Sequence, residues 1–83
     1  MNGTITLEIL SPEKTLFKGE VALVRLPGAK APFTVLLNHA PLVSMLDAGT
    51  VQWEAWNGSG EITISGGFIQ VNDNYVTLCV ETL

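Results

Sequence analysis

Short apolar segments separated by turn-forming residues run through the whole chain, and this pattern restricts its fold more than any other feature. Apolar residues nowhere recur at the i, i+3, i+4 and i+7 positions of an amphipathic helix for more than one turn. Residues 4–10 instead alternate, with Ile5, Leu7 and Ile9 on one face and Thr4, Thr6 and Glu8 on the other. A period of two is typical of a half-buried β-strand, so the chain is predicted to fold from strands.

Eight or more short strands are predicted, each closed by a turn signal. They are residues 4–10, a short segment around Leu16 and Phe17, and residues 21–26, 33–37, 42–46, 51–56, 61–65, 68–71 and 75–80. Asn57-Gly58 predicts a hairpin with a primed turn, and Gly66-Gly67 predicts a bulge or a change of sheet. We expect one all-β domain over residues 1–83, a small antiparallel two-sheet sandwich or flattened barrel of about eight to ten short strands.

The composition fits a folded domain and excludes some classes of partner. Hydrophobic residues make up 47% of the chain and charged residues 14%, the opposite of the balance found in disordered chains. The net charge is −4 and the few cations are scattered, so no basic stripe is available for nucleic acid. No apolar run approaches the ~20 residues of a membrane-spanning helix, and no secretory signal is visible. The single Cys79 indicates a reducing compartment.

Reactive side chains are too few to predict a catalytic or metal site. A Cys–His nucleophile pair would require Cys79 and His39 to meet, yet Cys79 lies in an apolar strand where a small buried residue is expected. A zinc site cannot be assembled from one histidine and one cysteine. The segment 58–60 lacks the lysine and the following helix of a phosphate-binding loop. We therefore expect no enzyme, no metal and no cofactor.

The two tryptophans support the main alternative function. Trp53 shares a strand face with Val51 and Ala55, so core packing is expected. Trp56 lies on the polar face at the strand end, where it either covers the adjacent turn or contacts a ligand or partner. A sugar-binding β-sandwich would display such a tryptophan, so the alternative is a small carbohydrate-binding module. A minimal hydrolase using scattered carboxylates is a more distant option.

The segment 26–42 is the most distinctive part of the chain and reads LPGAKAPFTVLLNHAPL. Pro41 fixes its own φ and biases Ala40 away from helix, so Asn38 and His39 are predicted to lie on an ordered turn between two extended segments. His39 is the single histidine of the chain. Its ring either ties down a nearby carbonyl or takes part in recognition.

This segment resembles the hallmark loop of the epsilon subunit of F-type ATP synthases, in which LPG, F-x-V-L and N-H-A-P-L occur in the same order. Further matching residues are Ser11-Pro12-Glu13, Phe17-Lys18-Gly19-Glu20, Ser65-Gly66-Gly67-Phe68, Val71 and Asn74. The resemblance covers nearly the whole chain. It implies the N-terminal β-sandwich domain of a non-catalytic rotor subunit of the central stalk, which binds the gamma subunit and the c ring and couples ion-driven rotation to ATP synthesis.

The resemblance also implies two contact sites. The gamma subunit is expected to contact Asn38, His39, Ala40, Pro41 and Leu42. The c ring is expected to contact Ala29, Lys30, Ala31 and Pro32.

The chain departs from the family pattern at four positions. Ala31 and Thr34 stand where the family usually has glycines, Pro32 where it has an acidic residue, and Leu37 where it has a proline. An apolar contact or Lys30 is therefore expected to replace the usual charge pairing with the c ring.

Length is the larger departure. Family members commonly carry a C-terminal helical hairpin that restrains ATP hydrolysis and in some cases binds ATP, whereas this sequence ends just past its last predicted strand. The chain is therefore expected to couple gamma to the ring without that brake and without binding ATP. The resemblance places it at the cytoplasmic face of the bacterial inner membrane, in a peripheral complex, with no insertion of its own into the bilayer.

Overall fold

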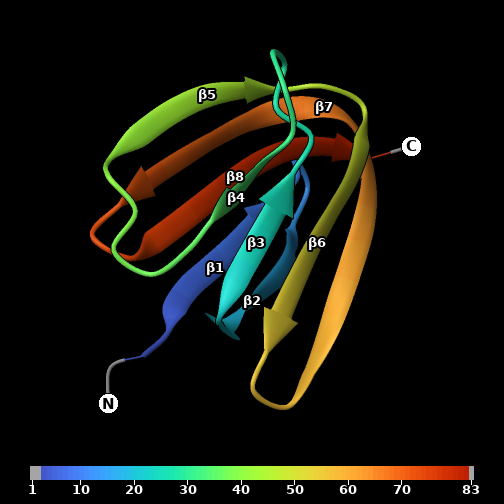
Figure 1. The fold of residues 1–83 in the computed structure, drawn as a ribbon. Coiled ribbons are helices and arrows are strands. Elements are labelled where there is room, and N and C mark those ends of the chain that lie inside the picture. Colours follow the sequence, from blue (N-terminus) through green and yellow to red (C-terminus); the bar gives the residue numbers. More distant parts are fainter. Residues whose placement is uncertain (1–2, 83) are drawn as a thin grey trace.

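The computed structural model describes residues 3–82, which form eight β-strands and no helix (Figure 1). The strands are β1 (Ile5–Leu10), β2 (Thr15–Val21), β3 (Leu23–Leu26), β4 (Phe33–Val35), β5 (Leu42–Leu46), β6 (Gly49–Ala55), β7 (Gly58–Asn72) and β8 (Tyr75–Thr82). The predicted all-β fold is confirmed.

The long strand β7 joins the two layers of the fold. Hydrogen bonds connect the strands in the order β2-β1-β8-β7-β6-β3-β4, and β5 also pairs with β7. The N-terminal half of β7 pairs with β6, whereas its C-terminal half lies between β8 and β5. One layer therefore contains β2, β1, β8 and β5, the other contains β6, β3 and β4, and β7 belongs to both (Figure 1).

Gly66 and Gly67 mark the point where β7 changes layer. The pairing register with β8 shifts between Ile64 and Gly66, as in a bulge. A Cβ atom on Gly67 would collide with the carbonyl oxygen of Cys79 and would lie 2.9 Å from the Cα of Val80. The predicted bulge is confirmed. The strands expected at residues 61–65 and 68–71 are one strand, because the bulge bends the ladder without ending it.

Two further details differ from the sequence prediction. Among the strands described, β1 and β8 pair in parallel, whereas all other pairs are antiparallel. The short segment predicted around Leu16 and Phe17 is part of the longer strand β2, which continues through Gly19 to Val21 because Gly19 pairs with Leu7 in the ladder.

The β6–β7 hairpin is confirmed, but its turn is not the predicted one. Ala55 pairs with Gly58, so Trp56 and Asn57 form the two-residue loop. Positive φ occurs at Gly58 (145°) and not at Asn57, so the predicted primed turn is wrong. The observed register places Gly60 opposite Trp53. Glycine suits this position, because a Cβ on residue 60 would lie only 2.5 Å from the Trp53 indole.

The core lies between the two layers and is entirely aliphatic. Its buried side chains are Ile5, Leu7, Ile9, Val21, Val24, Leu26, Val35, Leu46, Val51, Ile64, Ile69, Val71, Val76, Leu78 and Val80. The alternation predicted for residues 4–10 is confirmed, since the three apolar residues of that strand are fully buried. No buried polar or charged residue occurs among residues 3–82. Close packing of this kind makes the domain stiff.

The two glycines of the bulge provide a matched test of the layer change. We expect Gly67→Ala to lower the free energy of unfolding by ~2 kcal/mol or more, because its Cβ would meet the backbone of β8. Gly66→Ala should cost much less, because the nearest atom to its Cβ, the carbonyl oxygen of Leu46, lies 3.7 Å away. Urea unfolding of both variants measures the difference. Equal losses would show that β7 does not depend on close approach at Gly67.

Candidate functional site

An ordered turn presents His39. The His39 N–H donates a hydrogen bond to the carbonyl oxygen of Leu36 at 3.1 Å, which closes a four-residue turn. Asn38 occupies its third position with a φ of 64°, and Leu37 before it does not have positive φ. This is the pattern of a type II turn, in which asparagine or glycine is preferred at the third position. The turn predicted around Asn38 and His39 is confirmed.

The His39 ring forms a hydrogen bond with a neighbouring backbone carbonyl. Its Nδ1 lies 2.8 Å from the carbonyl oxygen of Ala40, and the residue is half-buried. A carbonyl can only accept, so Nδ1 carries the hydrogen and donates it. Among residues 3–82, Nε2 has no hydrogen-bond partner, so it is available to a binding partner. The structural role predicted for His39 is present, and its role in recognition remains a prediction.

The second predicted loop lies at the opposite end of β5. The Ala29 N–H donates to the carbonyl oxygen of Met45 at 3.1 Å, and the Asp47 N–H donates to that of Pro27 at 2.8 Å. These bonds fasten the loop to the C-terminal end of β5, whereas the His39 turn leads into its N-terminal end. Residues 29–32 are all exposed. Figure 1 shows the two loops at opposite ends of β5.

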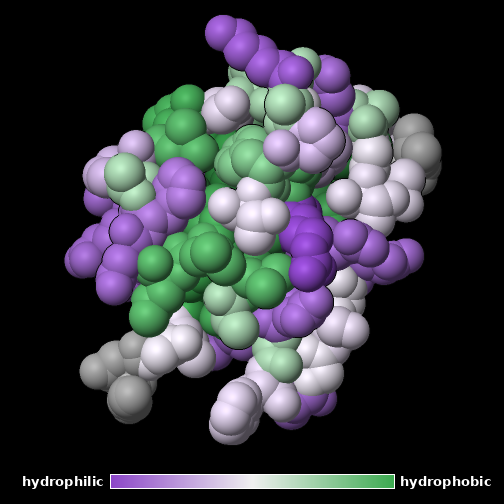
Figure 2. All heavy atoms as spheres, in the orientation of Figure 1, coloured by the Kyte–Doolittle hydropathy of each residue, from purple (hydrophilic) through white to green (hydrophobic). Residues whose placement is uncertain are grey.

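Large apolar side chains are exposed on β5, on its partner β7 and in the His39 turn. Val43 and Met45 point outward from β5 and are 73% and 63% exposed, and Met45 pairs across the sheet with the exposed Phe68 of β7. Leu36 and Leu37, in the segment between β4 and β5, are exposed as well. We call these five residues the apolar strip. Figure 2 shows hydrophobic side chains gathered over β5 and over the segment that joins it to β4.

Sequence reasoning missed the outward side chains of this strip. A usable signal was present, because residues 42–46 read LVSML and carry apolar residues on both faces of the strand. A strand with one face in water normally alternates apolar and polar residues. Apolar residues on both faces therefore indicate that the outer face is covered by something else.

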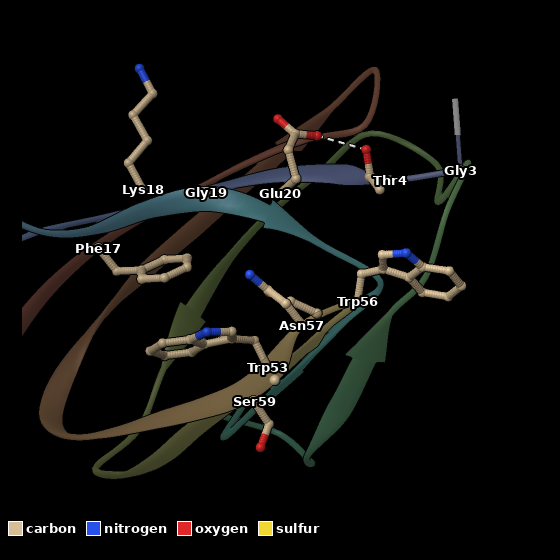
Figure 3. A pocket seen from close by; sticks show the side chains of 12 residues that line it. Gly3, Thr4, Phe17, Lys18, Gly19, Glu20, Trp53, Trp56, Asn57 and Ser59 are labelled. Carbon is tan, nitrogen blue, oxygen red and sulfur yellow. Dashed lines mark hydrogen bonds between the residues drawn. The ribbon is translucent and has the colours of Figure 1, made fainter. Parts of the chain in front are cut away.

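A cleft of about 1020 Å³ opens at the end of the sandwich away from the Ala29 loop, between β2 and the β6–β7 hairpin (Figure 3). The rings of Phe17 and Trp53 line its interior with their centroids 4.5 Å apart, and Trp53 packs on the core as predicted. Trp56 stands at the rim and is 98% exposed, so it does not cover the adjacent turn. The Trp56 indole is therefore accessible to a ligand or a partner.

A fixed negative charge lies at the same rim. The hydroxyl groups of Thr4 and Thr6 donate to the two oxygens of Glu20 at 2.6 and 2.9 Å, and these hydrogen bonds lower the pKa of the Glu20 carboxyl. The carboxylate therefore stays ionised at neutral pH.

Cys79 does not lie where it was expected. Val76, Leu78 and Val80 face the core, so alternation along β8 places Cys79 on the opposite, half-buried face. The expected burial in the core is therefore wrong. Five residues of strand, on the order of 17 Å, separate Cys79 from Asn74, the residue that contacts the His39 turn. The structure does not bring Cys79 and His39 together as a nucleophile pair.

Residues 3–82 contain no group of three or more His, Cys, Asp and Glu side chains arranged to hold a metal ion. They also contain no helix with the length and hydropathy needed to cross a membrane.

Comparison with known proteins decides the family. The family model described as "ATP synthase, Delta/Epsilon chain, beta-sandwich domain" matches residues 4–83. The chain belongs to this family. The predicted resemblance to the epsilon subunit is thereby confirmed, and the sandwich architecture agrees with the family's description.

Individual relatives support the same assignment. The ATP synthase epsilon chain of Desulfitobacterium hafniense is 40% identical over 99% of this chain and 62% of its own length. That of Leptospira borgpetersenii is 39% identical over 93% of this chain and 61% of its own length. One solved structure is the Euglena gracilis mitochondrial ATP synthase, an OSCP/F1/c-ring assembly. One of its chains superposes on this one with a TM-score of 0.88 at 25% identity, and the match covers 96% of this chain and 52% of the Euglena chain. This epsilon-type chain thus spans about three fifths of the length of its curated relatives.

The two tryptophans of the cleft are expected to differ in their effect on stability. Trp53→Ala should lower the free energy of unfolding by ~3 kcal/mol, because it removes a ring packed on Phe17 and the core. Trp56→Ala should change it by less than ~0.5 kcal/mol, because that side chain is almost fully exposed. Urea unfolding followed by far-UV circular dichroism measures both values. A large loss for Trp56→Ala would contradict the placement of its ring in solvent.

Proposed function

We propose that this domain belongs to the central stalk of an F-type ATP synthase, where it binds the gamma subunit and the c ring and couples ion-driven rotation to ATP synthesis. The apolar strip carries the proposal. Its five side chains, Leu36, Leu37, Val43, Met45 and Phe68, are exposed in the isolated domain, and Met45 pairs across the sheet with Phe68. Several large apolar side chains exposed on one small domain indicate an interaction site.

The gamma subunit is the partner we assign to the apolar strip and to the adjoining residues Asn38, His39, Ala40, Pro41 and Leu42. The strip supplies an apolar centre, and the His39 turn supplies a polar edge with a free imidazole nitrogen. This is the usual composition of a stable protein interface, which buries on the order of 1,000 Å² or more.

The c ring is the partner we assign to Ala29, Lys30, Ala31 and Pro32. These residues are exposed at the end of β5 remote from the His39 turn, so both partners can bind at once. Lys30 is the one charged residue of the four, and Pro32 has no N–H to donate. The contact we propose is therefore apolar, with Lys30 placed to pair with an acidic or carbonyl group of the ring.

The stiffness of the sandwich supports a coupling role. Strand β5 joins the two contact loops and is paired with β7, which runs through both layers. Torque applied at one loop therefore reaches the other through packed strands and does not pass through a hinge. The proposal concerns the β-sandwich domain, within a peripheral complex that we place at the cytoplasmic face of the bacterial membrane.

The cleft at Trp56 is the one observation that favours the alternative, a carbohydrate-binding module. An exposed indole beside polar groups is the usual platform for a sugar ring. Titration of the isolated domain with a glycan panel, read by tryptophan fluorescence, tests it. Saturable quenching that is lost in Trp56→Ala would favour this alternative, and we expect none.

A charge placed in the apolar strip should weaken binding to gamma. Met45→Lys should lower the affinity about tenfold or more, because it puts an ammonium group at the centre of the apolar surface. Thr63→Lys is the matched control, because Thr63 is also exposed but lies on the part of β7 that pairs with β6 in the other layer. Surface plasmon resonance with the cognate gamma subunit measures both. Equal affinities for the two variants would place the gamma interface elsewhere.

Charge reversal in the second loop should affect the c ring alone. Lys30→Glu should reduce retention of the domain on detergent-solubilised c ring, while gamma affinity stays unchanged, because Lys30 lies at the other end of β5 from the His39 turn. Lys18→Glu on β2 makes the same change in net charge and serves as the control. Loss of ring retention in both variants would indicate a general charge effect and contradict a specific contact at Lys30.

A further inference from the structure

Two asparagines that are 36 residues apart in the sequence bind each other side by side. The backbone N–H of Asn38 donates to Oδ1 of Asn74 at 2.6 Å, and Nδ2 of Asn74 donates to Oδ1 of Asn38 at 3.1 Å. Both residues have positive φ, 64° for Asn38 and 61° for Asn74. We call this pair of hydrogen bonds the asparagine clasp. It joins the turn that presents His39 to the turn between β7 and β8.

The backbone of Asn74 is held in place by the β7–β8 hairpin and by a hydrogen bond from β1. Asn72 pairs with Tyr75, and the two loop residues between them, Asp73 and Asn74, both have positive φ, as in the primed turns that suit tight hairpins. The carbonyl oxygen of Asn74 also accepts a hydrogen bond from the N–H of Thr6 at 2.9 Å. Asn74 is therefore held on both sides before it contacts Asn38.

One backbone N–H of the His39 turn requires a hydrogen-bond acceptor from outside the turn. In a turn of this type, the N–H of the third residue is not used by the hydrogen bond that closes the turn. Here that N–H belongs to Asn38, and Asn74 is its acceptor. The second position is Leu37, where proline is favoured because its ring fixes φ. A leucine leaves that torsion free, so the turn gains its order from the clasp.

We propose that Asn74 is a positioning residue for the gamma-binding loop: it holds the turn that carries His39 and the exposed Leu36 and Leu37 in its binding conformation before the partner arrives. This inference rests on the proposed function. The physical gain is pre-organisation, because a loop that is competent for only a fraction of the time weakens the apparent affinity by that fraction.

Two glycine substitutions in the same turn separate the clasp from general turn flexibility. Asn74→Gly tolerates the positive φ but removes the side chain that reaches Asn38. Asp73→Gly makes the same backbone change at the neighbouring position, where φ is 54° and no side-chain hydrogen bond is formed within residues 3–82. We expect Asn74→Gly to lower gamma affinity roughly five- to tenfold, and Asp73→Gly to change it by less than about twofold.

A proline at position 37 provides a rescue. Leu37→Pro fixes the second position of the turn covalently, so Asn74→Gly should cost clearly less affinity in the Leu37→Pro background than in the wild-type background. A double-mutant cycle measures this coupling and cancels the direct effect of losing the leucine contact. Purely additive losses would contradict the positioning role.

Amide hydrogen exchange on the isolated domain tests the clasp without any partner. Exchange at Asn38 should accelerate in Asn74→Gly and stay near the wild-type rate in Asp73→Gly, because only the first variant removes the acceptor. Wild-type protein that fails to bind gamma would count against the proposed function, whatever the exchange rates are. Wild-type binding with equal affinity in Asn74→Gly, or an equal loss in Asp73→Gly, would overturn the positioning role of Asn74 and leave the proposed function standing.

Discussion

The passage of β7 from one layer to the other is the constraint on which the rest of the structure depends. Its N-terminal half completes one layer with β6, and its C-terminal half lies between β8 and β5 in the other. The change is possible because Gly67 lets the backbones of β7 and β8 approach more closely than a Cβ would allow. The aliphatic core is then enclosed by a single hydrogen-bonded sheet, and close packing of its side chains makes the domain stiff.

That ladder also positions the candidate contact surface. β5 is held by β7 along its length, so its inward residues reach the core while Val43 and Met45 stay exposed. The two loops at its ends are fastened separately, one by backbone hydrogen bonds to Met45 and Asp47 and the other by the asparagine clasp. The surface is therefore a rigid strip with an ordered loop at each end, a geometry suited to joining two parts of a rotor.

Much of the fold and part of the site could be predicted from local residues. The alternation around Ile5 and Leu7 indicated strands, Pro41 after the His39 pair indicated an ordered turn, and the motif order indicated the family. Predictions failed where a distant partner decided the outcome. The turn at Asn57 differs from the prediction because the Trp53 indole occupies the space next to Gly60. Cys79 faces away from the core because Leu78 and Val80 on either side of it face the core.

By itself, the sequence determined that this chain is a β-domain of the ATP synthase delta/epsilon family with an ordered His39 loop, because period-two alternation, turn residues and motif order are local properties of the chain. The tertiary structure alone decided which apolar residues stay exposed and which residue holds the loop. Val43 and Leu46 look alike in sequence, and Asn38 and Asn74 lie 36 residues apart. The pairing of β5 with β7 leaves Val43 exposed and buries Leu46. The pairing of β7 with β8 forms the turn that brings Asn74 to Asn38.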